Sequence, residues 1–510
     1  GAAVSHLVIG PVLLPLFAGV VLLLGAGWPL AWQRAVGLTA AAALVPLSLL
    51  LLGTTLDGGY GVYALGDWPS PFAIVLVADR LSATLVALTS VLALFALLHA
   101  SRGTDTEGRH FHALFQFQLF GVEGAFLTGD LFNLFVFFEV LLIASYTLLL
   151  HGGGRVRTRA AVHYVVLNLV GSSLFLIAAG VLYGVAGTLN LAELAVRVAA
   201  LPPEDVGLAR AGGLLLLVVF GLKAALLPFH LWLPATYAGA AAPVAALFAI
   251  MTKVGVYAIV RVFNLVFGSA AGSLAGLGEA WLWPLALATV VVGAIGALGS
   301  RSLRRLVAYL VVVSVGTLLA GVALGSGAAL AASLFYLVHS TLVTGGLFLL
   351  ADVIGRRRGH ASDSLVPGAP FPRPLVPGVL FLLLAVGMAG LPPLGGFLGK
   401  LLLLQAAVSS PWAPWLFTVV LGAGILSLVA LGRAGSTLFW RRSEPPEQEA
   451  VARERPGALA PVVALASGAL LFVVLAGPVA ELTRATAAQL AEPAGFVDAV
   501  LGPRSGERLR

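Results

Sequence analysis

Long apolar segments separated by short polar connections make up most of this chain. We count fourteen segments, which fall near 7–25, 36–53, 81–99, 112–128, 131–150, 160–184, 213–231, 243–263, 281–299, 303–322, 328–354, 376–407, 415–440 and 458–476. A helix needs about 20 mostly apolar residues to cross a bilayer. The pattern therefore predicts an all-α polytopic membrane protein with about 14 transmembrane helices.

The composition supports a membrane protein and excludes several other classes. Hydrophobic residues make up 60% of the 510 residues and charged residues only 10%, whereas a soluble domain is about 25% charged. The chain has no cysteine, which excludes disulfides, thiolate metal sites and thiol nucleophiles. We find no nucleotide, metal or nucleophile motif, so the sequence predicts neither a cofactor nor a self-contained enzyme.

The arginines behind the net charge of +7 lie in the connections, so we interpret them as topology signals and not as a nucleic-acid surface. With the segments numbered in order, 17 of the 26 arginines fall on odd-to-even connections: Arg34, Arg102, Arg109, Arg155, Arg157, Arg159, Arg301, Arg304, Arg305, Arg356, Arg357, Arg358, Arg373, Arg441, Arg442, Arg453 and Arg455. The opposite connections offer little besides Arg80, Arg197, Arg210 and Arg261. The positive-inside rule then places both termini on the outer side of a bacterial cytoplasmic membrane.

Three stretches do not read as spans. Thr54 to Asp79 contains a glycine-rich turn and an alternating segment, which predicts an external hairpin. Arg441 to Pro456 is dense in charge and proline and predicts a solvated cytoplasmic loop. The tail after Gly477 predicts a short interfacial helix followed by a frayed end. The first apolar segment lacks a basic leader and a cleavage site, so we interpret it as a span and not as a signal peptide.

The three lysines carry the strongest chemical signal, because none of them lies in a connection: Lys223, Lys253 and Lys400. Arginine keeps its charge at any accessible pH, whereas a desolvated lysine can exchange its proton. Lys223 follows Gly213 by ten residues, about 15 Å along a helix, which places it near the bilayer midplane. Charges there are costly and usually functional. The alternative is a lysine that extends its amine to the lipid headgroups from a helix end.

Two further ionisable residues lie deep inside predicted spans. Glu139 is surrounded by aromatic and aliphatic residues, so its carboxyl group must be protonated or paired with a cation. A Glu–Lys pair whose separation varies is a way to load and release a proton. A static ion pair that only fixes helix packing is the alternative. His339 also lies mid-span, and it is either a relay group or a core histidine bonded to a neighbouring carbonyl.

Secondary candidates are Glu123, His230, Asp79 and Asp130. Asp130 is expected to cap the helix that begins at Leu131. Glu123 is either a second proton site or a satisfied polar contact.

Two of the lysines lie beside residues that break helices. Pro228 follows Lys223, and a run from Gly390 to Gly396 with two prolines precedes Lys400. Interrupted helices in corresponding halves of a chain are typical of inverted-repeat transporters, in which the ion site lies at the break. The alternative is that the prolines only kink the helices for packing.

The run from Gly129 to Tyr146, with Glu139 at its centre, closely resembles the D-subunit family of multisubunit Mrp-type sodium/proton antiporters. The motifs Lys223 to Pro234, Ala242-Pro243, Lys253 to Tyr257 and Gly390 to Lys400 are similar to the signature of the wider proton-translocating antiporter family, which includes the membrane subunits of respiratory complex I. Together these motifs cover the predicted spans 4 to 12.

The resemblance implies a fold with two inverted five-helix repeats and broken helices 7 and 12. In this sequence the implied parts are 1–111 with helices 1 to 3 and the external hairpin, 112–263 with the first repeat, 281–440 with the second repeat, and 441–510 with the cytoplasmic loop, helix 14 and an external tail.

The resemblance also implies a proton relay through five groups: Glu139, Lys223, Lys253, His339 and Lys400. This sequence departs from the pattern after the histidine, where several relatives carry a further lysine and this chain reads Leu342 to Gly346. Water is then expected to bridge His339 to Lys400.

These observations predict a transporter subunit and not an enzyme. The expected function is proton translocation in a multisubunit cation/proton (Na+/H+) antiporter, with other antiporter subunits as partners. The alternative is a proton-pumping membrane subunit of a complex I-like NADH-quinone oxidoreductase or of a membrane hydrogenase. The motif around Glu139 and the absence of a long lateral helix after span 14 favour the antiporter. A purely structural scaffold would need no titratable residues at the midplane. No cluster of oxygen ligands identifies the cation.

Overall fold

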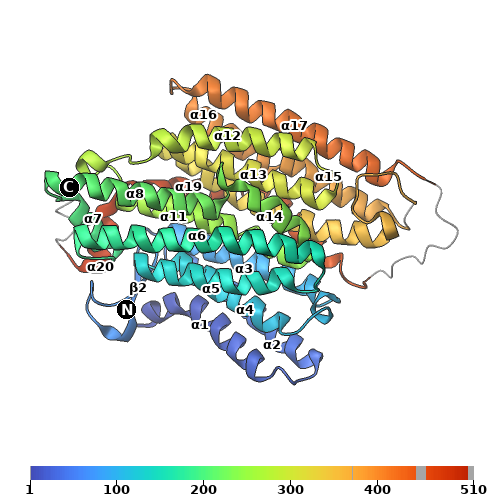
Figure 1. The fold of residues 1–510 in the computed structure, drawn as a ribbon, viewed down its shortest axis with the longest axis horizontal. Coiled ribbons are helices and arrows are strands. Elements are labelled where there is room, and N and C mark those ends of the chain that lie inside the picture. The colour runs from blue at the N-terminus through green and yellow to red at the C-terminus, as the bar shows by residue number, and fades with distance from the viewer. Residues whose placement is uncertain (1, 370–371, 444–454, 504–510) are drawn as a thin grey trace.

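The computed structural model describes residues 2–369, 372–443 and 455–503 as a bundle of long, roughly parallel helices (Figure 1). Most of the predicted loop from Arg441 to Pro456, the stretch 444–454, lies outside the described residues. The first elements are α1 (Ala2–Leu24), α2 (Leu30–Gly53), β1 (Gly61–Ala64), β2 (Val75–Ala78), α3 (Arg80–Ala100), α4 (Phe111–Leu127), α5 (Leu131–Leu150), α6 (Arg155–Ala186) and α7 (Leu191–Ala199).

The remaining helices follow in the order α8 (Pro203–Ala224), α9 (Trp232–Gly239), α10 (Ala242–Phe248), α11 (Met251–Leu265), α12 (Glu279–Leu298), α13 (Leu303–Ala323), α14 (Gly327–Arg357), α15 (Leu375–Ala389), α16 (Gly395–Ala407), α17 (Ala413–Phe439), α18 (Ala460–Val474), α19 (Ala476–Ala491) and α20 (Pro493–Leu501).

Many of these helices are suited to cross a membrane. In the described part of the chain, 11 are long and apolar enough, or up to 12 if the bent pair α18 and α19 counts as one span. The chain is therefore a multi-pass membrane protein. The predicted segment 112–128 is α4, with only 17 residues, and the predicted segment 376–407 is divided into the shorter helices α15 and α16.

The central helices are covered by others on all sides. The apolar stretch of Ala242–Leu265, which contains α10 and α11, is 100% buried inside the protein, and that of α14 is 94% buried. A helix that is apolar all round is usually enclosed by other helices or by lipid. These enclosed helices carry Lys253 and His339, so the protein itself keeps both side chains away from lipid.

The predicted hairpin between Thr54 and Asp79 is present. Strand β1 pairs with β2 in antiparallel register from Gly61 opposite Ala78 to Ala64 opposite Val75. The Gly129 N–H donates a hydrogen bond of 2.8 Å to the Val75 carbonyl. The hairpin therefore packs over the connection between α4 and α5.

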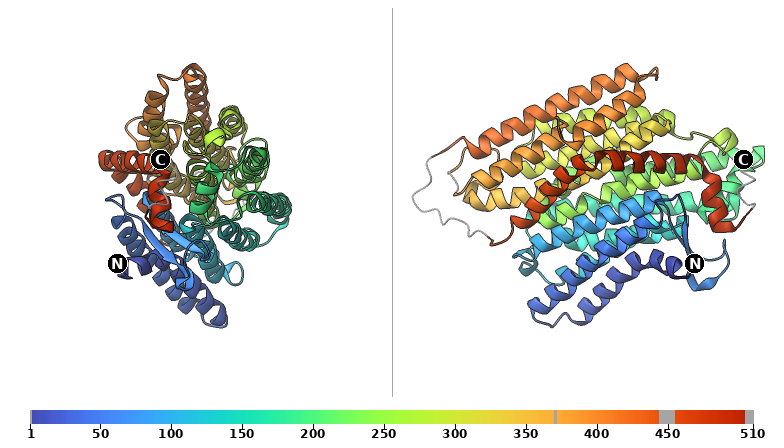
Figure 2. Two further views of the ribbon diagram at one scale, coloured as in Figure 1. Left: turned by 90° about the vertical axis from the view of Figure 1, so that its left-hand side faces the viewer. Right: turned by 180° about the vertical axis from the view of Figure 1, so that it is seen from behind.

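The C-terminal part differs from the prediction of an interfacial helix after Gly477. Helix α19 bends away from α18 by 78° and packs beside α14. The rear view in Figure 2 shows the C-terminal helices, in red, lying along the bundle. The Arg80 backbone N–H donates to the Gln489 side chain at 3.2 Å, which attaches α19 to the start of α3. The short helix α20 packs against α7.

Both interruptions suggested by glycine and proline are present. Helix α8 ends at Ala224 and is followed by Ala225 in the left-handed conformation, with a φ of 64°. The exposed backbone groups find partners: the Trp232 indole donates to the Leu222 carbonyl at 3.0 Å, and the Leu227 N–H donates to the Thr289 hydroxyl at 2.9 Å. A break in a membrane helix is tolerated when neighbouring groups satisfy the backbone in this way.

The second interruption separates α15 from α16. Gly390 follows the end of α15 with a φ of 78°, a conformation that glycine adopts without strain. Helix α16 begins five residues later, at Gly395.

Candidate functional site

Lys223 lies in the last turn of α8, directly before the first interruption, and is 5% exposed. Its Nζ donates to the Asn168 side-chain oxygen at 3.2 Å and to the Asn168 carbonyl at 3.5 Å. The amine also lies 5.8 Å from the centroid of the Phe138 ring. A cation near a helix C-terminus and an aromatic face is stabilised by both.

Glu139 lies half-buried near the middle of α5, and its Oε1 accepts a hydrogen bond from the Ser172 hydroxyl on α6. No ion pair within 4.0 Å connects Glu139 to Lys223 in the part of the chain that the structure describes. Asn168 and Ser172 are four residues apart and share one face of α6. This polar face therefore contacts both the acid and the lysine.

Lys253 is completely buried in α11, where its Nζ donates to the neighbouring Thr252 hydroxyl at 3.3 Å. A Cβ atom at Gly255 would lie 2.5 Å from the Ala224 nitrogen, so only glycine permits this crossing of α11 and α8. The crossing places the turn that carries Lys253 against the interruption that follows Lys223.

His339 is 1% exposed on α14 and faces the second interruption. Cβ atoms at Gly387, Gly395 and Gly396 would lie 3.2, 2.7 and 3.3 Å from atoms of its ring. We call these three residues the glycine cradle. The ring Nε2 has no hydrogen-bond partner within the described residues.

Lys400 lies on α16 and bends back toward the end of α15, where its Nζ is 3.5 Å from the Ala389 carbonyl. Its charge interacts with His339 without a direct hydrogen bond among the residues described. The second interruption thus brings His339 and Lys400 together. The bridge of water between them remains a prediction.

The secondary candidates have separate surroundings. Glu123 is fully buried on α4, with the Ser90 hydroxyl 3.4 Å from Oε1 and no partner for Oε2 in the described structure. His230 lies in the turn Phe229–Leu231 before α9, and its Nδ1 is unpartnered among the described groups. Asp130 caps α5 as predicted, because it accepts from the Asn133 N–H at 2.8 Å. No hydrogen bond among the described residues joins these three to a lysine.

Asp79 has a structural partner. Its oxygens accept two hydrogen bonds from Arg261, at 2.6 and 2.7 Å, and both side chains are buried. Burial acts to raise the pKa of Asp79, but the charge and hydrogen bonds of Arg261 outweigh burial and lower the pKa. The pair joins the start of α3 to α11. Arg261 therefore lies inside a helix, not in a connection as the count of arginines assumed.

A further buried acid lies at the opposite end of the bundle. Asp105 accepts two hydrogen bonds of 2.7 Å from Arg34 and one of 2.9 Å from His112. Burial acts to raise the pKa of Asp105, but these hydrogen bonds outweigh burial and hold the pKa at about 2. The group joins α2, the connection after α3, and α4.

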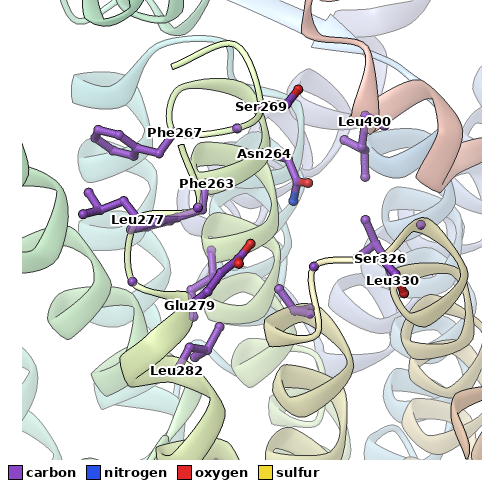
Figure 3. A pocket seen from close by; sticks show the side chains of 18 of the residues that line it. Phe263, Asn264, Phe267, Ser269, Leu277, Glu279, Leu282, Ser326, Leu330 and Leu490 are labelled. Carbon is purple, nitrogen blue, oxygen red and sulfur yellow. The ribbon is translucent and has the colours of Figure 1, made fainter. Parts of the chain in front are cut away.

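A cavity of about 270 Å³ opens where α11, α12, α14 and α19 meet (Figure 3). Glu279 is the acidic side chain in its lining, and Asn264, Ser269 and Ser326 add polar groups. Glu279 has no distinctive signal in the sequence, because an acid directly before an apolar segment has the pattern of an ordinary first-turn helix residue.

Asn168 and Ser172, the polar neighbours of Lys223 and Glu139, were not predicted from the sequence. A signal was available, since two polar residues four positions apart in an apolar segment predict a polar stripe on one helix face.

Comparisons with known proteins identify the family to which this chain belongs. Residues 128–427 match the family model described as NADH:quinone oxidoreductase/Mrp antiporter, TM. The chain belongs to this antiporter family. The matched region contains Glu139, Lys223, Lys253, His339 and Lys400.

Relatives of this antiporter-family chain extend over its whole length. It is 42% identical to a Rhizobium meliloti protein named as a probable K(+)/H(+) antiporter D subunit, with 99% of each chain covered. It is 36% identical to the Na(+)/H(+) antiporter D subunit of Bacillus subtilis, with 98% of this chain and 99% of the relative covered.

Solved structures share the fold of this family member. A chain in the structure of the Mrp complex from Dietzia sp. DQ12-45-1b has a TM-score of 0.86 and 27% identity, with 98% of this chain and 100% of that chain covered. A chain of respiratory complex I from Thermus thermophilus with bound NADH has a TM-score of 0.75 and 28% identity, with 95% and 99% covered.

Proposed function

We propose that this chain is the proton-translocating D-type subunit of a multisubunit cation/proton antiporter. The main support is the placement of two lysines and a histidine at two helix interruptions, in a chain whose full-length relatives are named as antiporter D subunits. Lysine is suited to this task because its amine holds and releases a proton, whereas arginine stays charged.

The proposed path begins at Glu139. When the carboxylate approaches Lys223 through the polar face of α6, the ammonium form is retained, and when it withdraws, the proton moves on toward Lys253. From there it passes to His339 and Lys400 at the second interruption. Water completes the steps that no direct hydrogen bond covers.

We also propose that the fold contains 14 transmembrane helices with two inverted repeats, 112–263 and 281–440, flanked by 1–111 and 441–510. The support is that each proposed repeat contains one interrupted segment next to a lysine, at α8 and at α16. The arginine distribution supports a location in the bacterial cytoplasmic membrane with both termini outside.

The cation is proposed to be sodium, and the other antiporter subunits are proposed to complete its route. The relatives are named for different cations, potassium in Rhizobium meliloti and sodium in Bacillus subtilis. Sodium and potassium are therefore compared in the same cation/proton exchange assay.

A proton-pumping subunit of a redox complex is the second candidate, favoured by the likeness to complex I at 28% identity. The relatives named as antiporter D subunits reach 42% and 36% over nearly the whole chain, which favours the antiporter.

The test is cation/proton exchange in vesicles that contain the complete complex, with and without Glu139→Ala. A pH gradient should collapse on addition of sodium in the native complex and persist in the variant. Glu204→Ala, which removes an exposed acid at the start of α8, is the control and should exchange normally. Normal exchange by Glu139→Ala, with either sodium or potassium, would refute the proposal.

A further inference from the structure

We propose that a groove between α15 and α17 binds one anionic phospholipid, with an acyl chain along the groove and the phosphate at Arg442. The groove has a volume of about 660 Å³. Its lining is almost entirely apolar and includes Val379 and Leu382 on α15 and Leu428 on α17. Those three side chains are also exposed on the surface of the bundle, which places the groove against the membrane.

Glycines create the space for an acyl chain. Gly378, Gly432 and Gly435 all line the groove. At Gly432 an added Cβ would meet no heavy atom within 4 Å, so the groove is open there. Larger side chains at these positions would fill it.

The length of the groove fits a lipid acyl chain better than a transmembrane helix of a partner subunit. On α15 the lining extends from Pro374 to Val386, which is about 18 Å at the helical rise of 1.5 Å per residue. The hydrocarbon core of a bilayer is about 30 Å thick, so one leaflet measures about 15 Å. The groove thus matches one leaflet, whereas a crossing helix would need a surface of twice that length.

The charge at one end identifies the headgroup. Arg442 lines the end of the groove, and Arg441 and Arg373 are exposed nearby in sequence to the lining residues Trp440 and Pro374. Basic pockets between membrane helices bind anionic headgroups, and the arginine guanidinium binds phosphate with two hydrogen bonds. Trp440 is 79% exposed, as expected for an aromatic residue at the membrane interface. This inference does not depend on the proposed transport activity.

The test measures lipid retained by the purified complex after detergent washing, using phosphatidylglycerol and phosphatidylcholine with the same acyl chains. The native complex should retain about one phosphatidylglycerol more per chain than Gly432→Phe, whose ring fills the groove. Gly422→Phe is the matched control: it lies on the same helix, outside the groove, and its Cβ also points into open space. It should retain lipid like the native complex.

A second variant tests the headgroup contact. Arg442→Gln should reduce the preference for phosphatidylglycerol over phosphatidylcholine about fivefold, because one arginine near an anionic lipid contributes about 1 kcal/mol. A photo-crosslinking residue at position 432 should label lipid. Equal retention by Gly432→Phe and Gly422→Phe, or labelling of another subunit in place of lipid, would overturn the proposal.

Discussion

Ser172 and Asn168 lie one turn apart on α6, where Ser172 bonds to Glu139 and Asn168 bonds to Lys223. The bond between Ser172 and Glu139 predicts a measurable effect on the rate of cation/proton exchange. Removing the Ser172 hydroxyl leaves Glu139 without its hydrogen bond. A hydrogen bond to a charged group contributes about 1.5–3 kcal/mol, and 1.4 kcal/mol is a factor of ten. Ser172→Ala should therefore slow cation/proton exchange at least about tenfold.

The adjacent Ser173 provides the control, because its hydroxyl is exposed and, among the described residues, donates to the Leu169 carbonyl of its own helix. Ser173→Ala should exchange at the native rate. Equal rates for both variants would show that the α6 hydroxyl takes no part in transport.

Lys223 allows charge and proton exchange to be separated. Both Lys223→Ala and Lys223→Arg should abolish exchange, because arginine keeps the charge but does not release a proton. Assembly of the complex, measured by copurification of the other subunits, should be unchanged. Full transport by Lys223→Arg would leave only an electrostatic role for this residue.

Asp105 predicts a pH-dependent contribution to stability. The pKa of an unfolded aspartate is about 3.9, and the folded pKa of Asp105 is about 2. The stabilisation is therefore complete above about pH 4 and disappears as the pH falls through about 2. Asp105→Asn should lower the melting temperature at pH 7, and the difference from the native complex should shrink between about pH 4 and pH 2.

The control for this measurement is Glu204→Gln, which removes an exposed acid. The melting temperature of Glu204→Gln should equal that of the native complex at every pH. A constant deficit of Asp105→Asn down to pH 3 would contradict the assigned ionisation.

Sequence alone identified the ionisable residues of the candidate site but not their neighbours. The three lysines stand out in the sequence because the chain has so few of them and because all three lie inside apolar segments. The contacts of Lys223 depend on which face of α6 meets α8. The apolar residues of α6 face both the bundle and its surface, so their pattern does not show which face packs against α8. In the structure Glu139 and Lys223 each form a hydrogen bond to a polar side chain of α6, and the sequence did not predict these two contacts.

Among the helices, α3 and α11 are joined by a buried ion pair whose loss should be costly. Arg261→Leu leaves Asp79 charged and buried, which should destabilise the protein by about 3–5 kcal/mol. The double variant Arg261→Leu/Asp79→Asn should recover part of this loss, because no lone charge remains. Chemical unfolding in detergent measures the difference.

An exposed pair on α7 is the matched control. Arg197 lies 3.0 Å from Glu193, and its side chain is 57% exposed. Arg197→Leu should change stability by less than about 0.5 kcal/mol. If Arg261→Leu proved equally mild, the tie between α3 and α11 would have no energetic importance.

The interruptions of α8 and of α15–α16 were predictable because proline and glycine act locally on the backbone. The bend at α19 was not. Glu481 and Arg484 lower the average hydropathy of this helix, whereas Thr483, Thr486, Ala487 and Leu490 form its buried face. Hydropathy records the average along a helix and misses a narrow packed face.

For the whole molecule, the single chain should not transport by itself. It provides one set of proton-relay groups, and in the described structure no group of three or more histidine or acidic side chains is arranged to hold a metal ion. An antiporter must bind both ions in linked states. Liposomes with this chain alone should show little or no sodium/proton exchange, and addition of the partner subunits should restore it.

The control is the same reconstitution with Lys223→Ala in the complete complex, which should remain inactive. Robust exchange by the lone chain that Lys223→Ala abolishes would disprove the need for partners while supporting the relay.

The glycine cradle packs His339 against the same interrupted segment that carries Lys400. Its members belong to both halves of an interrupted segment, Gly387 on α15 and the other two on α16. A side chain at any of these three positions would come into tight contact with the imidazole, so the ring is packed closely against both halves. Lys400 is carried by the same α16, with its amine at the end of α15. Any shift of α16 that changes the packing around His339 therefore also moves the segment that carries Lys400, so the surroundings of both side chains change together.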